Sequence, residues 1–133
     1  MSNSAYYHGL PIYKSAMEAT KAVHGASRRM PRFHKYAIGA QMQRQSIEVI
    51  TLIARANTKA SRAATLPLLC AAADNLRILV DVAHEVQALA SFAEYATLAE
   101  KVVDLARQAQ AWRRHSEGPA GPEPAGDSRK GAT

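Results

Sequence analysis

The amino-acid sequence predicts an all-α protein, an antiparallel up-down-up-down four-helix bundle. Apolar residues recur at spacings of three and four along most of the chain, and strictly alternating runs of β-branched residues are missing. Four segments of about 20 residues carry this pattern, and short connections between them favour packing of consecutive helices. The chain has 133 residues, enough for one domain.

The first predicted helix runs from Leu10 to Arg28. Pro11 falls in its first turn, where the missing N–H costs no helical hydrogen bond. One stripe of this helix is expected to face the core: Tyr13, Ala16, Met17, Thr20, Val23 and His24. Residues 1–9 precede the helix and are expected to be flexible.

The second predicted helix follows a break at Pro31 and runs from Tyr36 to Asn57. Five of its residues are expected to point inward: Ile38, Met42, Val49, Ile53 and Ala56. Three more widen the apolar arc: Ile47, Ile50 and Leu52. Because this arc is broader than one core needs, we expect a second buried face and self-association.

The third predicted helix begins at Ser61 or Thr65, which places Pro67 in the first turn, and it ends near Leu89. Its apolar residues follow regular steps of three and four: Leu69, Ala72, Leu76, Leu79, Ala83 and Val86. This seam predicts close packing against the neighbouring helices.

The fourth predicted helix has the clearest start, a Ser-Phe-Ala-Glu capping box at Ser91 to Glu94, and it ends near Arg114. Its predicted seam repeats the same steps: Phe92, Tyr95, Ala99, Val102, Ala106 and Ala109. The bundle thus spans residues 10–115. Residues 116–133 are rich in glycine and proline and predict a disordered tail.

The single cysteine and the apolar runs indicate a cytoplasmic protein. Cys70 cannot form an intramolecular disulfide and is expected to lie in the core, and the first residues show no secretory pattern. We expect no membrane-spanning segment, because the nearest apolar run, Leu66 to Ala73, contains Pro67 and ends at Asp74.

Positive charge is concentrated in one part of the sequence. The chain has 17 Lys and Arg against 11 Asp and Glu, a net charge of +6. Nine cations in residues 21–62 are opposed only by Glu48, and we call them the predicted basic stripe: Lys21, Arg28, Arg29, Arg32, Lys35, Arg44, Arg55, Lys59 and Arg62. In a bundle, residues 28–35 would lie at one end, and Lys59 with Arg62 at the other. Such a surface suits nucleic-acid phosphates without base readout, although a basic face that only keeps the protein soluble is the alternative.

Arg77 is a separate candidate, since apolar residues surround it in the third helix. Asp74 and Asp81 lie three and four residues away, so a salt-bridge ladder within the helix can explain it. The alternative is an arginine that contacts a partner protein.

Motifs for catalysis and metal binding are nearly missing. The sequence has no pair of histidines at ligand spacing, no glycine-rich phosphate loop and no arrangement typical of a nucleophile, so we expect no enzyme, metal or cofactor. The exception is Arg29-Met-Pro-Arg-Phe-His34, which is similar to the Arg-x4-His motif of the all-helical HEPN ribonucleases. A ribonuclease therefore remains an alternative.

Three blocks of sequence carry a resemblance to a known family: LPIYKSAMEAT, RRMPRFHKYAIGAQMQRQSIEVITLIARAN and LRILVDVAHEVQALASFAEYATLAEKVVDLARQAQAWRR. Their order and spacing over about residues 8–115 resemble the four-helix-bundle accessory variability determinant (Avd) proteins of diversity-generating retroelements. The chain resembles more distantly the bundle proteins encoded within ribosomal RNA intervening sequences.

The resemblance implies a homopentameric barrel without catalytic activity, cofactor, small-molecule substrate or membrane. Such a barrel binds the reverse transcriptase of the retroelement and its template RNA or cDNA, and it supports mutagenic retrohoming into a target gene. Carried over by position, Arg77 looks like the family's partner-binding arginine, and the predicted basic stripe looks like the family's basic surface. A protein-protein adaptor without a nucleic-acid role is the second alternative.

Overall fold

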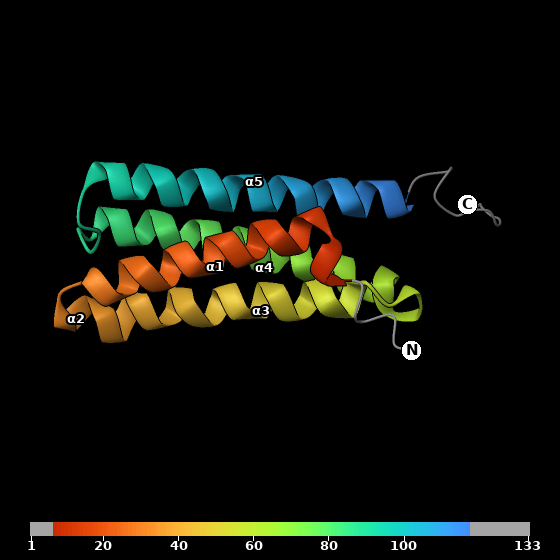
Figure 1. Ribbon diagram of the computed structural model, residues 1–133, viewed down its shortest axis with the longest axis horizontal. Helices are drawn as coiled ribbons and strands as arrows, with labels where there is room; N and C mark the ends of the chain where they lie inside the picture. The colour runs from red at the N-terminus through yellow and green to blue at the C-terminus, as the bar shows by residue number, and fades with distance from the viewer. Residues whose placement is uncertain (1–6, 118–133) are drawn as a thin grey trace.

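The computed structural model describes residues 7–117, and this part of the chain is all-helical. Its four long helices pack as a bundle: α1 (Pro11–Arg29), α3 (Ala40–Ala56), α4 (Lys59–Glu85) and α5 (Phe92–Glu117) (Figure 1). A short helix α2 (Arg32–His34) and a π-helical turn η2 (Lys35–Gly39) lead directly into α3.

The order of the helices around the bundle creates two opposite sides. Helix α1 packs against α3 and α5, and α4 packs against the same two helices. The α1–α5 side and the α3–α4 side therefore face away from each other. Figure 1 shows α2 and the α4–α5 turn at one end, here named the α2 end, and the α3–α4 turn at the other.

Helix α1 begins as predicted, with Pro11 in the first turn. The residues just before it are ordered by a short turn in which the Leu10 N–H donates to the Tyr7 carbonyl at 3.1 Å. The rings of Tyr7, His8 and Tyr13 contact one another, with centroids 4.3 to 5.2 Å apart. Residues 7–9, which were predicted to be flexible, therefore form an ordered turn. Residues 1–6 lie outside the described part.

The second helical segment begins at Arg32, four residues before the predicted start at Tyr36. Pro31 is the N-cap and its backbone is extended, so the break predicted there is confined to Met30 and Pro31. The chain then continues through η2 without a second break. A π-turn of this kind inserts one residue per turn and is frequent at functional sites.

Helix α4 begins at Lys59, before either predicted start, and Pro67 lies inside it. The first turn is fastened to α3, because the Ser61 hydroxyl donates to the Arg55 carbonyl at 2.8 Å. The carbonyl that Pro67 leaves without a donor belongs to Ala63, which is exposed, so water can satisfy it.

Helix α4 ends at Glu85 rather than near Leu89. Gln87 adopts a left-handed conformation with φ 62°. The Ala88 N–H donates to Ala83 O at 2.9 Å and the Gln87 N–H to His84 O at 3.0 Å. These two bonds form a Schellman motif, which stops the helix.

The capping box predicted at α5 forms with one difference. The Glu94 N–H donates to the Ser91 hydroxyl at 3.1 Å, as expected. The Glu94 carboxylate accepts from the N–H of Ala90 at 2.9 Å, rather than from that of Ser91. Helix α5 continues to Glu117, two residues into the predicted tail, and residues 118–133 lie outside the described part.

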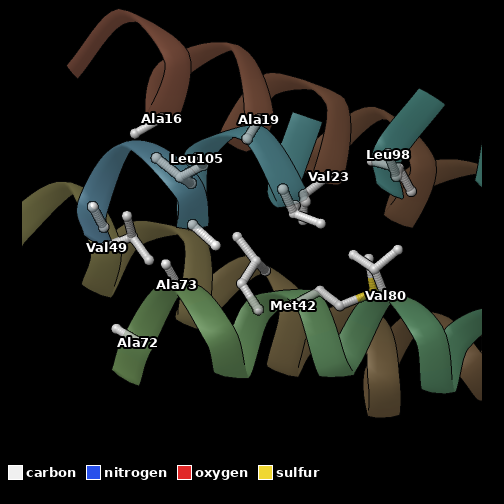
Figure 2. Close-up of a cluster of buried hydrophobic side chains, with 14 of the residues drawn as sticks. Ala16, Ala19, Val23, Met42, Val49, Ala72, Ala73, Val80, Leu98 and Leu105 are labelled. Carbon is white, nitrogen blue, oxygen red and sulfur yellow. The ribbon is translucent and has the colours of Figure 1, made fainter. Parts of the chain in front are cut away.

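The core is correctly predicted for α3 and partly wrong elsewhere. All five inward residues of the second predicted helix are buried. In α5 the buried face is rotated from the predicted seam, since Leu98 and Leu105 are buried and Phe92 is 69% exposed. Figure 2 shows Val23, Met42, Val80 and Leu105 converging from four helices.

Helix α4 is the most apolar of the four long helices. By length and composition alone it could cross a membrane, although 44% of the apolar window is buried inside the bundle. No membrane-spanning segment was expected from the sequence, because Pro67 and Asp74 interrupt the apolar run. The whole of α4 is nevertheless long and apolar enough to span a membrane. A helix that packs in the core of a bundle can be equally long and apolar, so these two properties do not by themselves distinguish α4 from a membrane span.

Candidate nucleic-acid interface

Four cations of the predicted basic stripe lie at the α2 end. Arg28 and Arg29 are in the last turn of α1, Arg32 is in α2 and Lys35 is in η2. The first three are exposed and Lys35 is half-buried. The Arg32 guanidinium lies 5.7 Å from the ring centroid of Tyr36, a cation–π distance.

Two further cations line a groove between α3 and α4. Arg44 and Arg55 lie on its α3 wall, with Glu48 between them, and Leu68 and Leu79 lie on its α4 wall. The groove encloses about 490 Å³. Its positive charge along α3 is suited to a phosphate backbone, and its other wall is apolar apart from Asn75.

Lys21 and Arg29 line a different groove, between α1 and α5, which encloses about 520 Å³. Lys21 is 3.5 Å from Glu18. Arg29 forms an ion pair with Glu94, and its Nε donates to that carboxylate at 2.9 Å. Because this groove and the α3–α4 groove face opposite sides, the predicted basic stripe is not one continuous surface on a single chain.

At the α3–α4 turn, Lys59 is exposed but Arg62 has a structural role. The Arg62 side chain donates to the carbonyls of Ala56 and Asn57, each at 2.9 Å. Its guanidinium also lies 5.9 Å from the ring centroid of Trp112. Arg62 therefore satisfies the free carbonyls at the end of α3 and connects that end to α5.

Six cations of the predicted basic stripe keep their charge available to solvent. They form no ion pair with an acid among residues 7–117, and we call them the unpaired cations: Arg28, Arg32, Lys35, Arg44, Arg55 and Lys59. They run from the last turn of α1, which holds Arg28, through α2, η2 and α3 to Lys59, the first residue of α4.

Arg77 forms half of the ladder predicted for it. Its guanidinium lies 3.8 Å from Asp74, and both side chains are partly exposed. Asp81 instead accepts a 2.8 Å hydrogen bond from the Tyr95 hydroxyl. This bond raises the pKa of Tyr95 above its ordinary value, because it favours the protonated phenol.

Helix α4 has an exposed apolar face that was not predicted from the sequence. We call it the α4 apolar face, and its members are exposed: Leu68, Ile78, Val82 and Val86. Only Val86 of this face belongs to the predicted seam of the third helix. Ile78 adjoins Arg77 in the sequence. The signal was present, since apolar residues occur on both sides of the predicted seam.

Two exposed aromatic residues among the cations of the α2 end were also missed. Phe33 is 80% exposed and Tyr36 is 70% exposed. The sequence Arg-Phe-His-Lys-Tyr interleaves aromatic and basic residues, and this pattern could have identified them.

The remaining candidate groups are structural or isolated. Cys70 is buried as predicted, and burial raises the pKa of its thiol, an effect that Arg113 partly offsets. Arg29 of the ribonuclease-like motif is bound to Glu94, and the ring of His34 contacts that of Phe33. Among residues 7–117, no group of three His, Cys, Asp or Glu side chains could hold a metal ion.

No family model, no curated protein and no solved structure matches this chain.

Proposed function

We propose that this protein is a noncatalytic nucleic-acid-binding accessory protein of a diversity-generating retroelement. The observation that supports this proposal best is the set of unpaired cations that runs from the end of α1 through α2, η2 and α3 to the start of α4. Lysine and arginine side chains that are not held in an ion pair can bind phosphates and displace the counterions of the nucleic acid, and this release favours binding at low salt.

The three sequence blocks support the retroelement role. On this proposal the chain binds the reverse transcriptase together with template RNA or cDNA in the cytoplasm, and it supports the copying of the template without cleaving or joining nucleic acid. Its four helices run antiparallel in an up-down-up-down bundle, and five such chains form a homopentameric barrel in which the grooves of neighbouring subunits join and extend the positive surface. Assembly multiplies weak contacts by avidity.

The polymerase contact is proposed on a different surface from the phosphate contact. Arg77 is 45% exposed beside the exposed Ile78 of the α4 apolar face. An arginine at the edge of exposed apolar side chains is typical of protein interfaces. One side of α4 would thus bind protein while the cations of α3 bind phosphates.

Charge reversal in the α3–α4 groove tests the phosphate contact. The variant Arg44→Glu with Arg55→Glu should weaken binding to template RNA at least about tenfold, because it removes two phosphate contacts and adds repulsion. The control Arg107→Glu with Arg114→Glu changes the net charge by the same amount at exposed positions of α5. It should bind nearly as the wild type does. Equal loss in both variants would show that net charge, rather than this surface, governs binding.

A protein-protein adaptor is the second candidate, and the α4 apolar face favours it. In that case, reversal of Arg28 and Arg32 to Glu, which leaves the structural Arg29–Glu94 pair in place, should leave retrohoming intact, whereas Ile78→Asp should abolish it. The ribonuclease alternative is tested by incubation of the wild type with RNA. Cleavage that His34→Ala removes without unfolding would support it.

A further inference from the structure

We infer that Phe33 and Tyr36 form a stacking platform for unpaired bases, so that the α2 end selects single-stranded nucleic acid over duplex. This inference rests on the proposed function and specifies which form of nucleic acid the protein binds. It comes from the juxtaposition of two exposed aromatic rings with unpaired cations on the segment between α1 and α3.

The exposure of these rings is the first step. Phe33 and Tyr36 are the two most exposed large apolar side chains in the described part of the chain. Single exposed apolar residues are common on protein surfaces, but two aromatic rings three residues apart on one helical segment form a local patch. Neither side chain contributes to the core.

The charge around the rings identifies the occupant. Arg28, Arg32 and Lys35 surround the two rings in the sequence and are all unpaired among residues 7–117. Aromatic rings stack on bases while neighbouring cations contact the phosphates between them, which is how single strands are bound without sequence readout. An apolar protein partner would not require this concentration of positive charge.

Arg32 contributes to the platform itself. Its guanidinium already lies over the Tyr36 ring, 5.7 Å from the centroid. A planar guanidinium stacks on bases as well as on aromatic rings. The ring of Phe33 meets that of His34 edge to face at 5.2 Å, which restricts the ring orientation before a base binds.

The segment that carries Phe33 and Tyr36 is held firmly against α1. The Gln43 side chain donates to the buried Ser27 hydroxyl at 2.6 Å and so connects α3 to α1. Gly39 packs so closely that an added Cβ would lie 2.6 Å from the Ser27 hydroxyl and 3.0 Å from the sulfur of Met30. A base that stacks here therefore meets a preformed surface and orders little of the chain.

Selection of single strands follows from the geometry of bases. In a duplex both faces of each base are covered by its neighbours, so the rings gain nothing. In a single strand a base can leave its neighbours without breaking a base pair, which makes its faces accessible, and stacking contributes about 5- to 150-fold in affinity for each base by alanine substitution. Both single-stranded RNA and single-stranded DNA offer this chemistry.

Binding of three labelled probes of equal length tests the inference: a single-stranded oligoadenylate, its abasic counterpart with phosphates but no bases, and a duplex. The double variant Phe33→Ala with Tyr36→Ala should lose at least about fivefold in affinity for the oligoadenylate. Its affinity for the abasic strand and the duplex, and its salt dependence, should stay at wild-type values. A second double variant, Phe33→Tyr with Tyr36→Phe, keeps both aromatic rings and should bind the oligoadenylate as the wild type does.

Phe92→Ala is the matched control, because Phe92 is also an aromatic side chain with about the same exposure, 69%, but lies on a different segment, α5, where its ring contacts those of His84 and Tyr95. It should bind all three probes as the wild type does. Unchanged oligoadenylate binding by the double variant, or equal loss for the abasic strand, would overturn the platform while the proposed function stands. Loss of co-purifying polymerase with unchanged binding of all probes would instead assign the rings to a protein contact. If the wild type binds none of the probes at low salt, the proposed function fails as well.

Discussion

The side chain of Arg29, at the end of α1, donates to the carboxylate of Glu94, 65 residues further along the chain, in the first turn of α5. The same carboxylate accepts from the backbone N–H of Ala90. Glu94 therefore caps α5 and attaches α1 to it at the α2 end, and its side chain is only 12% exposed.

The Arg29–Glu94 contact predicts a pH dependence of stability. Burial raises the pKa of Glu94, but the hydrogen bonds from Ala90 and Arg29 and the charge of Arg29 outweigh it and lower the pKa below its ordinary 4.5. A lowered folded pKa stabilises the protein above the unfolded pKa, and this contribution is lost as the pH falls through the folded value. Thermal unfolding of Glu94→Gln should therefore show a loss of about 1 kcal/mol at pH 7 that shrinks toward about pH 3. A loss that is the same at both pH values would contradict this account.

The fold is predicted to require glycine at position 39 because a larger side chain does not fit there, and not because of the backbone conformation. Its backbone is ordinary right-handed helix, but a methyl group would overlap the Ser27 hydroxyl. Gly39→Ala should lower the free energy of unfolding in urea by about 1–3 kcal/mol through overpacking. Gly25→Ala is the control, because its nearest neighbour, a nitrogen of Arg29, would be 3.5 Å away. It should be neutral or stabilising by up to about 1 kcal/mol.

Gln87 is predicted to be a site of local strain. It takes the left-handed position of the Schellman motif, which glycine occupies in most helices. Gln87→Gly should raise the free energy of unfolding by up to about 1 kcal/mol, as measured by urea denaturation. A decrease would show that the Gln87 side chain makes a contact that outweighs the strain.

Arg62 is predicted to matter for stability more than for binding. Arg62→Ala removes two hydrogen bonds to carbonyls at the end of α3 and the contact with Trp112. It should lower the free energy of unfolding by about 1–3 kcal/mol. Lys59→Ala, one turn earlier in an exposed position, should leave the unfolding curve unchanged and weaken RNA binding. The reverse pattern would restore Arg62 to the phosphate-binding surface.

The helices of this fold could be predicted from the sequence because their period and caps are local signals. Pro11 and the Ser91 capping box gave correct starts. The early start of α4 could not be predicted, because the contacts that hold its first turn come from Ser61 and Arg62 on carbonyls of α3. The end of α4 at Glu85 was missed, since the left-handed residue that stops the helix is Gln87 and not a glycine.

The positions of the charges could be predicted along the bundle but not around it. Spacing placed Arg28 and Lys59 at opposite ends. The sides of the bundle on which Lys21 and Arg44 lie depend on which helices are neighbours. The diagonal position of α1 relative to α4 could not be predicted from the sequence. The partners of Arg29 and Arg62 lie on other helices or turns, so a count of cations overstated the surface that is proposed to bind phosphates.

The dependence of RNA binding on salt tests the central claim most directly. The affinity of the wild-type protein for template RNA would be measured over a range of salt concentrations, and the logarithm of the association constant plotted against the logarithm of salt concentration. If the unpaired cations neutralise about five phosphates, the slope is about −3.5 for a single strand and about −4.5 for a duplex. A slope near zero, or no binding at the lowest salt, would contradict the account.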